Sequence, residues 1–591
     1  MAYSYVSLDR SEQVIRLLYI TPRKGSAAEL HTYQLKHVSL DESPQFETIS
    51  YCWGDPTPCR TVLIDGKELR LPRSSAAILE QISASSDQAR VIWIDAVCVN
   101  QTDITERAHQ VPLMARIYAQ ASRNIIYLGQ GDAVCSKALE DIRALSREID
   151  GLGADCDGEL QTPIDKSALS AFFCLPWFRR VWVVQEVALA RSSVCILGDG
   201  EIHFLEICQV VFSLFFRFSV ISFVAKFDGI IGATVVLMMR GLRFRIASGL
   251  PPDLNNVFLI SMMTQCTDLR DNVFGVLGLC HDGTAGAGTS SLIAVDYTKP
   301  YQQVFRDAAR HAIMTTRMTQ SDDARLACIT RWISHHSMAE LHDSTLPSWV
   351  PRFDRKMDTD QDGHALVVFC DDEEVAEEQS WSRDLGDPNV LELRGHVLGK
   401  VVQISPVFEP DMFSGDLAQL GCQLRTIQSM APAGRYDHQL GRVLIADTTY
   451  QTQPSTPEDW EGLQSMLDCL VKSPGRLTNS LSDDVVADCS INGYGDADVL
   501  YYRELVQSCR TRRFIVTDRG DLGLAPRTCQ IGDTAAALLV DYGGTPYILH
   551  PNEEDGTFKL VGHAYLDGYM PGRKDEAVSK GNINYDWLKM T

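Results

Sequence analysis

The first third of the sequence predicts an α/β fold, a doubly wound parallel sheet, and two observations support this. Short apolar runs rich in β-branched and aromatic residues alternate with helical patterns, as in sheets whose strands are joined by crossover helices. Polar side chains also crowd the stretch directly after the central strand, where open α/β sheets hold their ligands. At 591 residues the chain is too long for a single core, so we expect further domains.

The elements of this first part follow from local patterns. The central strand is expected at 91–94 and leads directly to Asp95. Asp103 and Glu106 predict the capped start of a helix, and Pro112 removes an amide inside that helix, which predicts a kink. Other strands are expected at 15–19, 46–52, 124–129 and 193–197, with a hairpin over 62–71 that turns at Asp65-Gly66 and a helix over 73–84.

Beyond residue 200 the pattern of the chain changes twice. It is mainly helical to about residue 345, and from 512 to 570 short strands alternate with Gly-Asp and Gly-Gly turns. We therefore expect an α/β domain over 1–200, a mainly helical region over 201–345, and a mixed, β-rich C-terminal region over 346–591.

Charge and cysteine content narrow the class of protein. The formal net charge of −23 argues against a nucleic-acid backbone or an anionic membrane surface as the main partner. The 17 cysteines are an odd number without any C-x-x-C pair, so we expect reduced thiols in a cytoplasmic protein. The first twenty residues carry several charges and no apolar core segment, which predicts that they are not a signal peptide.

The stretch 204–240 is the most apolar in the chain. Arg217, Lys226 and Asp228 divide it into uncharged runs that are each shorter than the roughly 18–20 residues needed to cross a bilayer. We therefore expect buried core helices and no transmembrane segment here, with contact at a membrane interface as the alternative.

Three separated blocks of sequence resemble the fungal heterokaryon-incompatibility (HET) domain. They are Ile49–Asp55, Trp93–Gln101 with Glu106-Arg107, and Trp177–Glu186. Further segments, 270–279, 346–351 and 522–526 followed by Gly532-Asp533, look like the usual C-terminal portion of such proteins. The resemblance implies a role in nonself recognition, in which HET domains trigger cell death after unlike cells fuse. It also implies a protein partner in this signalling and self-association.

The HET domain is also distantly similar to TIR domains, which are flavodoxin-like modules, some of which cleave NAD. Those enzymes carry a glutamate in a W-C-x-x-E pattern near the end of the domain. Trp182 and Glu186 have the same spacing here, with Val183 in place of the cysteine. The resemblance therefore implies a flavodoxin/TIR-like sheet, no resident cofactor, NAD as a substrate, and Glu186 as the catalytic residue.

Cleavage of NAD suits a single fixed carboxylate. Nicotinamide leaves as a neutral molecule, so no general acid is needed, and the task is to stabilise a ribosyl cation. Trp53 or Trp182 is suited to stacking on a base, and Arg107 is suited to pairing with a phosphate. The expected substrate-binding residues are Ser50, Trp53, Gly54, Asp55, Asp95, Asn100, Gln101, Arg107 and Trp182, of which Ser50, Asp55 and Asp95 are suited to bonding ribose hydroxyls.

Each of these residues also has a purely structural interpretation. Trp177 and Trp182 are typical core aromatics, and Asp95 and Asn100 are suited to satisfying loop amides as Asx turns do. Glu106 and Arg107 are as well suited to forming a helix cap and a surface ion pair as to binding a substrate. Gln185-Glu186 is as well suited to facing solvent as to lining a site. A nucleophilic cysteine paired with His109 is disfavoured for Cys52 and Cys98, because nothing in the sequence orients such a pair.

Several other motifs do not support a site. Asp358–Gly363 copies the first half of a calcium loop, but its twelfth position is Phe369, where a bidentate glutamate is required. His335, His336 and His342 lack a carboxylate at metal-site spacing, so no metal is assigned. Gly151-Leu152-Gly153 follows a helix and is no dinucleotide fingerprint.

Two classes of function remain for the first domain. One is an NAD-cleaving enzyme, which needs Glu186 in a concave site beside Trp53, Asp55 and Asp95. The other is a non-enzymatic signalling module that acts by self-association and partner binding, which needs only an exposed face.

Overall fold

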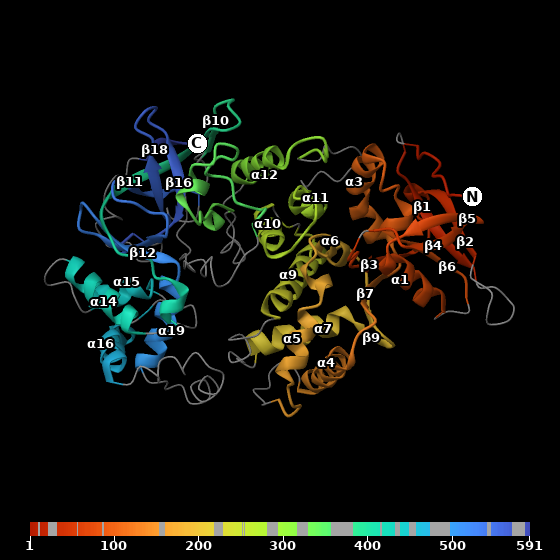
Figure 1. The fold of residues 1–591 in the computed structure, drawn as a ribbon, viewed down its shortest axis with the longest axis horizontal. Coiled ribbons are helices and arrows are strands. Elements are labelled where there is room, and N and C mark those ends of the chain that lie inside the picture. The colour runs from red at the N-terminus through yellow and green to blue at the C-terminus, as the bar shows by residue number, and fades with distance from the viewer. Residues whose placement is uncertain are drawn as a thin grey trace. The chain divides into compact units, whose positions relative to one another are not determined.

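The computed structural model divides into two compact units (Figure 1). The N-terminal unit consists of Met1–Pro252 and Met263–Lys299, and the C-terminal unit consists of Asp253–Met262 and Pro300–Thr591. The structure describes residues 1–9, 12–21, 32–55, 57–84, 88–152, 160–217, 229–250, 252, 254–280, 293–315, 329–355, 382–413, 417–431, 438–447, 455, 457–472, 497–540, 545–569 and 585–591.

The N-terminal unit is built on a nine-stranded sheet with the order β5-β4-β2-β1-β6-β3-β7-β8-β9. Its central strands β6, β3, β7 and β8 run parallel, while β1 pairs antiparallel with both β2 and β6. The strands are β1 (Val14–Thr21), β2 (Thr32–Ser39), β3 (Glu47–Tyr51), β4 (Arg60–Ile64), β5 (Lys67–Leu71), β6 (Arg90–Trp93), β7 (Asn124–Gly129), β8 (Ser193–Leu197) and β9 (Gly200–His203).

The prediction of a parallel sheet is therefore correct only for the four central strands, and the sheet as a whole is mixed. The antiparallel pairs are those of β1 with β2 and β6, of β4 with β5, and of β8 with β9. Of these strands, β2 and β9 were not expected from the sequence. The hairpin of β4 and β5 is confirmed. Asp65 and Gly66 both have positive φ, 50° and 73°, as the tight hairpin turn requires.

Helices connect the parallel strands. Asp103 caps α3 by accepting from the amides of Thr105 and Glu106, as predicted, and Pro112 lies inside this helix. One core cluster joins β1, β3 and β6 with α1 and α3. The helical segments are α1 (Arg73–Ala84), α2 (Asp95–Cys98), α3 (Ile104–Gln120), α4 (Ala133–Leu152), α5 (Lys166–Phe173), a 3₁₀ turn (Pro176–Arg179) and α6 (Trp182–Ala188).

The apolar stretch after residue 203 folds into helices that pack into the N-terminal unit. α7 (Phe204–Phe212) continues into a π-helical turn (Ser213–Arg217), and α9 (Ile230–Ala247) packs against α5, α6 and α7. Residues 218–228 lie outside the described part of the chain. Among the described helices, none has the length and apolar character required to cross a bilayer.

The C-terminal unit contains a second sheet with a closed ring of strands. β11, β14, β15, β16 and β18 each pair with two neighbours around the ring, and β12, β13 and β17 extend from β11. The strands are β10 (Ser382–Asp384), β11 (Leu391–Ile404), β12 (Arg512–Thr517), β13 (Leu522–Pro526), β14 (Thr534–Leu538), β15 (Thr545–Pro551), β16 (Phe558–His563), β17 (Tyr565–Leu566) and β18 (Asp586–Met590).

Helices flank this ring in the C-terminal unit. α14, α15, α16 and α19 share one buried cluster with β12, β13 and β17. The helices are α10 (Leu254–Met263), α12 (Tyr301–Thr315), α13 (Met338–Leu341), α14 (Leu417–Met430), α15 (His438–Leu444), α16 (Pro457–Lys472) and α19 (Ala497–Cys509).

Candidate functional site

The carboxyl ends of β3 and β6 bring two predicted site residues into contact. Trp53 follows β3 and Asp95 follows β6, and the indole Nε1 of Trp53 donates to Asp95 Oδ2 over 2.8 Å. The Ala96 amide donates to the other oxygen, Oδ1, over 2.7 Å. Burial raises the pKa of Asp95, while the charge of Arg180 and the hydrogen bond from Trp53 oppose this rise.

A buried serine and an arginine lie beside this pair. Ser50 Oγ accepts from Trp177 Nε1 over 2.9 Å, and Trp177 is fully buried, so the interpretation of Trp177 as a core aromatic is confirmed. The guanidinium of Arg180 donates to the carbonyl of Tyr51, the last residue of β3. Arg180 was not among the site residues expected from the sequence, although it lies inside Trp177–Glu186, the third block that resembles the HET domain.

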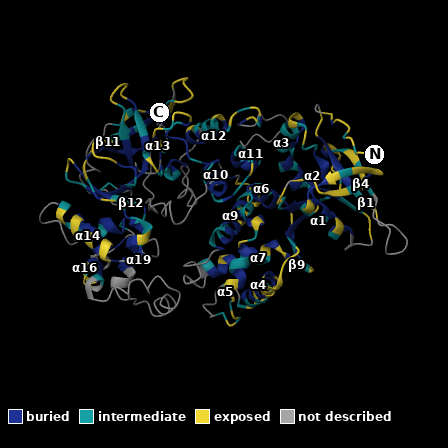
Figure 2. Cartoon of the chain, in the orientation of Figure 1, coloured by how far each residue is buried: buried dark blue, intermediate teal, exposed yellow. Residues whose placement is uncertain are grey.

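Glu186 lies on α6 and belongs to the same cluster. Its exposed fraction is 3%, so the alternative in which it faces solvent is wrong. Figure 2 shows α6 and its neighbouring helices coloured by burial. Burial raises the pKa of Glu186 to about 7, against the opposing effects of the Arg180 charge and the Ser50 hydroxyl. The charge of Asp95 contributes to this rise in pKa. Among the described residues, Glu186 Oε2 has no hydrogen-bond partner.

The cluster therefore holds two carboxyl groups and one guanidinium, of which Glu186 is buried while Asp95 and Arg180 are half-buried. Arg180 interacts electrostatically with both Glu186 and Asp95, so one positive charge is shared between two acids. A carboxyl group with a pKa near 7 exists in both protonation states at neutral pH, and such perturbed groups gather at functional sites. The arrangement is suited to holding a cationic group or to transferring a proton.

Four of the predicted residues belong to loops around this cluster. Gln101 Nε2 donates to the carbonyl of Asp95 over 2.9 Å, and so fixes the turn after β6. Asn100 Oδ1 accepts from the amide and hydroxyl of Thr102, as in an Asx turn. Gly54 has φ of 63° and is exposed, and the exposed Asp55 accepts from the amide of Thr57 over 2.9 Å.

Two predicted residues face a different part of the N-terminal unit. Trp182 Nε1 donates to Asp271 Oδ2 over 3.1 Å. The guanidinium carbon of Arg107 lies 4.6 Å from the ring centroid of Tyr297, a cation–π arrangement. Trp182 and Arg107 therefore contact the segment that follows α10.

Glu106 shows that one of the two sequence alternatives, a surface ion pair with Arg107, is wrong. It forms a buried ion pair with Arg16, with Arg16–Glu106 distances of 2.6 and 2.9 Å, instead of a surface pair with Arg107. It also accepts from the amide of Asn100 over 2.7 Å. Burial would raise the pKa of Glu106, but the hydrogen bonds from Arg16 and Asn100 outweigh it, and the pKa is lowered.

The remaining sequence alternatives have structural explanations. Cys98 is buried, and burial raises the pKa of its thiol to about 12, which leaves no thiolate to act as a nucleophile. His335 is buried against the carbonyls of Ser348 and Leu560. No group of three metal-binding side chains occurs among the described residues, and the segment 358–369 lies outside them.

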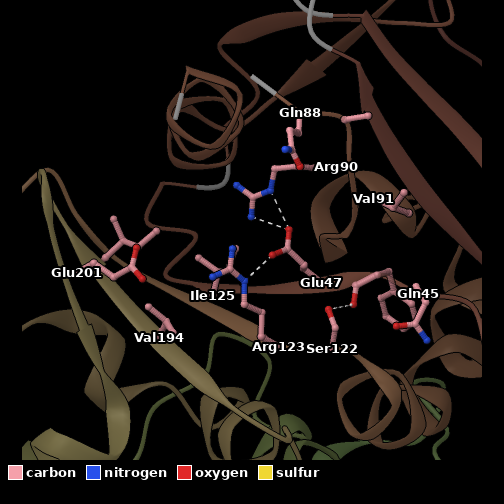
Figure 3. Close-up of a pocket in the computed structure, with 13 residues that line it drawn as sticks. Gln45, Glu47, Gln88, Arg90, Val91, Ser122, Arg123, Ile125, Val194 and Glu201 are labelled. Carbon is pink, nitrogen blue, oxygen red and sulfur yellow. Dashed lines mark hydrogen bonds and ion pairs between the residues drawn. The ribbon is translucent and has the colours of Figure 1, made fainter. Parts of the chain in front are cut away.

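An open pocket of about 550 Å³ lies at the opposite, amino-terminal edge of the parallel strands. Glu47 begins β3 and Arg90 begins β6, while Arg123 directly precedes β7. Figure 3 shows both guanidinium groups pointing at the carboxylate of Glu47, with Arg90 Nε–Oε2 and Arg123 Nε–Oε1 distances of 2.8 and 2.5 Å. This pocket contains none of the predicted site residues.

Comparison with known proteins defines the class of this chain. The family model "Heterokaryon incompatibility protein (HET)" matches residues 46–186, from the start of β3 to Glu186 itself. A second family model, "Het-6 beta-barrel domain", matches residues 486–583 in the C-terminal unit. The chain therefore contains one region that matches the HET domain and a second region that matches the Het-6 barrel domain.

One relative matches the chain from end to end. "Heterokaryon incompatibility protein 6, OR allele" of Neurospora crassa is 21% identical over an alignment that covers 98% of this chain and 97% of that protein. No solved structure matches the chain significantly.

Proposed function

We propose that this protein acts in fungal heterokaryon incompatibility, as an effector of the cell death that follows fusion of unlike cells. The HET and Het-6 barrel matches support this role, as does a relative that carries the name of such a protein and aligns with 98% of this chain. The proposal extends to the chemistry: the N-terminal unit cleaves the bond between nicotinamide and ribose in NAD.

One observation supports the chemical step above all others, namely the state of Glu186. It is a buried carboxyl group beside the carboxyl ends of β3 and β6, and one of its oxygens has no donor among the described residues. As the C–N bond breaks, its electrons leave with the neutral nicotinamide and a ribosyl cation remains. The ionised Glu186 stabilises that cation until water adds to it and releases a proton.

The topology of the parallel strands also supports a relationship to TIR domains. Numbered in chain order, β3, β6, β7 and β8 lie in the spatial order 2-1-3-4, which is the start of the flavodoxin-like order. The connections from β3 and β7 lead in opposite directions, and doubly wound folds bind ligands at the carboxyl side of such a switch point. In this reading Trp53 and Asp95 hold the substrate there.

The first test is consumption of NAD by the purified full-length protein at high concentration. Glu186→Gln keeps the shape of the side chain and removes its charge, and Glu140→Gln makes the same change at an exposed position on α4. We expect wild type and Glu140→Gln to consume NAD and Glu186→Gln to lose at least a hundredfold in rate, as when a key electrostatic group is removed. Equal NAD consumption by Glu186→Gln would refute the assignment of Glu186.

A second function, signalling by self-association without catalysis, is favoured by a specific observation. Glu186 is 3% exposed, and the pocket described above lies at the other end of the sheet. In this case Glu186→Gln would still cause cell death on overexpression in a fungal host, and neither protein would consume NAD. The pair of assays therefore separates the two functions.

A further inference from the structure

The chain passes between the two units more than once, and the segment between two of these crossings packs on the Glu186 helix. α10 belongs to the C-terminal unit, the following residues up to Lys299 belong to the N-terminal unit, and α12 belongs to the C-terminal unit again. We call the described residues 263–280 and 293–299 the strap. Both ends of the strap are therefore covalently tied to the C-terminal unit, whereas the strap itself packs within the unit that carries Glu186.

The strap is joined to the start of α6 through its backbone. The amide of Val181 donates to the carbonyl of Gln265 over 3.0 Å, and the amide of Gln265 donates to the carbonyl of Arg179 over 2.5 Å. These bonds bracket Arg180, whose side chain interacts with Glu186. A shift of the strap at Gln265 would therefore move the residue that shares its charge with Glu186.

The helix of the strap, α11 (Asp271–Leu277), packs closely against α6. A Cβ at Gly275 would lie 3.1 Å from a methyl carbon of Val181, and a Cβ at Gly278 would lie 2.5 Å from Gln185 Oε1. Glycine at both positions permits this approach. α11 thus covers the side of α6 at which Trp182 and Gln185 point, and contributes to the burial of this helix.

Asp271 joins α6 to the far end of the strap. Its Oδ2 accepts from Trp182 of α6 over 3.1 Å, and its Oδ1 accepts from the Tyr297 hydroxyl over 2.7 Å. Asp271 is buried, and Arg107 stacks on the ring of Tyr297. One side chain therefore connects three segments: the Glu186 helix, α11 and the end of the strap.

Contacts in each unit hold the strap and the helices that flank it. In the N-terminal unit, Arg270 donates to the carbonyls of Tyr297 and Lys299 and pairs with Asp268 over 2.7 Å. In the C-terminal unit, the rings of Phe258 of α10 and Phe305 of α12 both contact Phe353, with centroid separations of 5.0 and 5.2 Å. The two helices that carry the ends of the strap thus meet on one aromatic side chain.

We propose that the strap is the element through which the C-terminal unit regulates the Glu186 site, with Asp271 as a positioning residue. While the strap is seated, α6 is held in place and Glu186 stays buried. When the C-terminal unit changes the packing of α10 and α12 on Phe353, the strap loosens and α6 opens to water and substrate. The role of the opened α6 in NAD cleavage rests on the proposed function. The coupling between the C-terminal unit and α6 is measured without any substrate.

The physical basis is a linkage between two packing equilibria. Seating of the strap is favoured by contacts on α6 and by the geometry of its two ends, so a change at either place shifts the same equilibrium. Glu186 becomes more solvated when α6 opens, and an ionised carboxylate is then favoured at neutral pH. The opened state is therefore the one with the charge that cleavage of NAD needs.

The test is hydrogen exchange of the full-length protein, read at the Val181 amide and along α6. Phe353→Leu loosens the meeting point of α10 and α12 in the C-terminal unit. Phe408→Leu makes the same change at a buried position packed on Phe413, in the cluster with α14 and α19. We expect exchange at α6 to be about tenfold faster in Phe353→Leu, equivalent to about 1.4 kcal/mol, and unchanged in Phe408→Leu. If α10 and α12 exchange faster in Phe353→Leu while α6 does not, the coupling is refuted.

A second pair of variants tests the strap itself and does not disturb a core. Tyr297→Phe removes the hydroxyl that donates to Asp271 and keeps the ring under Arg107. Asp296→Asn alters a neighbouring side chain that accepts hydrogen bonds from Thr298 and does not bond Asp271 within the described part of the chain. We expect the amides of α6 to exchange faster than in wild type in Tyr297→Phe and at the wild-type rate in Asp296→Asn. Unchanged exchange in Tyr297→Phe would refute the role of Asp271. If α6 opens but no protein tested consumes NAD, the coupling through the strap is supported and the proposed NAD cleavage is refuted.

Discussion

Replacing Glu186 by glutamine is expected to stabilise the N-terminal unit at pH 8 and to leave its stability nearly unchanged at pH 4. Burial raises the pKa of Glu186 from its ordinary value of 4.5 to about 7. The folded state therefore binds the proton more tightly than the unfolded state between these two values. The stability of the wild type falls as the pH rises through this window, and it levels off above it. Glutamine does not titrate and escapes this loss.

The size of the effect follows from the same two values. A difference in pKa from 4.5 to about 7 corresponds to about 3 kcal/mol, because each pH unit is worth about 1.4 kcal/mol. The assay is urea denaturation at several pH values between 4 and 8. Short hydrogen-exchange pulses at β7 would follow the N-terminal unit alone. A variant that is less stable than wild type at pH 8, or a difference that does not grow with pH, would refute the reasoning.

Glu106→Gln is the matched control, because the same substitution is expected to act with the opposite sign. The pKa of Glu106 is lowered by Arg16 and the Asn100 amide, despite its burial. Its contribution to stability is therefore present above the ordinary pKa of glutamate and is lost as the pH falls through the lowered value. Breaking such a buried pair costs about 3–5 kcal/mol at neutral pH, and the cost should shrink in acid.

Three further predictions concern the same unit. Gly278→Ala places a methyl group against α6 and should destabilise the N-terminal unit by about 1–3 kcal/mol, measured by urea denaturation. Trp53→Phe removes the donor to Asp95 and should cost about 1–3 kcal/mol in the same assay; no loss would mean that water replaces the indole. Cys98 should resist alkylation in the native protein while the exposed Cys59 reacts, as peptide mass spectrometry would show.

The fold was predictable wherever one segment carries its own signal. The hairpin of β4 and β5 has Asp-Gly at its turn, and the four parallel strands are short apolar runs between helices. β2 was missed because its residues alternate between half-buried and exposed positions and contain Lys and His, so no apolar run marks it. Its place in the sheet depends on pairing with β1, which is not visible in either segment alone.

The site was predictable in position but only partly in composition. Asp95 was correctly placed next to Trp53 because both follow neighbouring strands. Glu106 was assigned to Arg107 because they are adjacent, whereas its partner Arg16 lies 90 residues away in the sequence. Arg180 and Asp271 were missed for a similar reason. A charged residue among aromatic ones gives no sign in sequence that it will be buried against groups from other segments.

The two edges of the parallel sheet differ in how their charges are balanced, and this difference indicates which kind of ligand the carboxyl edge favours. At the amino-terminal edge, Arg90 and Arg123 share the carboxylate of Glu47, and Glu201 also lines this open pocket, so two positive and two negative side chains balance there. At the carboxyl edge, Glu186 and Asp95 share the single guanidinium of Arg180, so negative charge is in excess whenever the buried Glu186 is ionised. Burying unbalanced charge is costly, and apolar residues of similar size would often give a more stable fold. The cost is explained if a positive group enters the carboxyl edge during function, as the pyridinium of NAD or the ribosyl cation would. The anionic part of such a ligand, the pyrophosphate of NAD, would be repelled by the two carboxylates and has to lie away from Glu186 and Asp95.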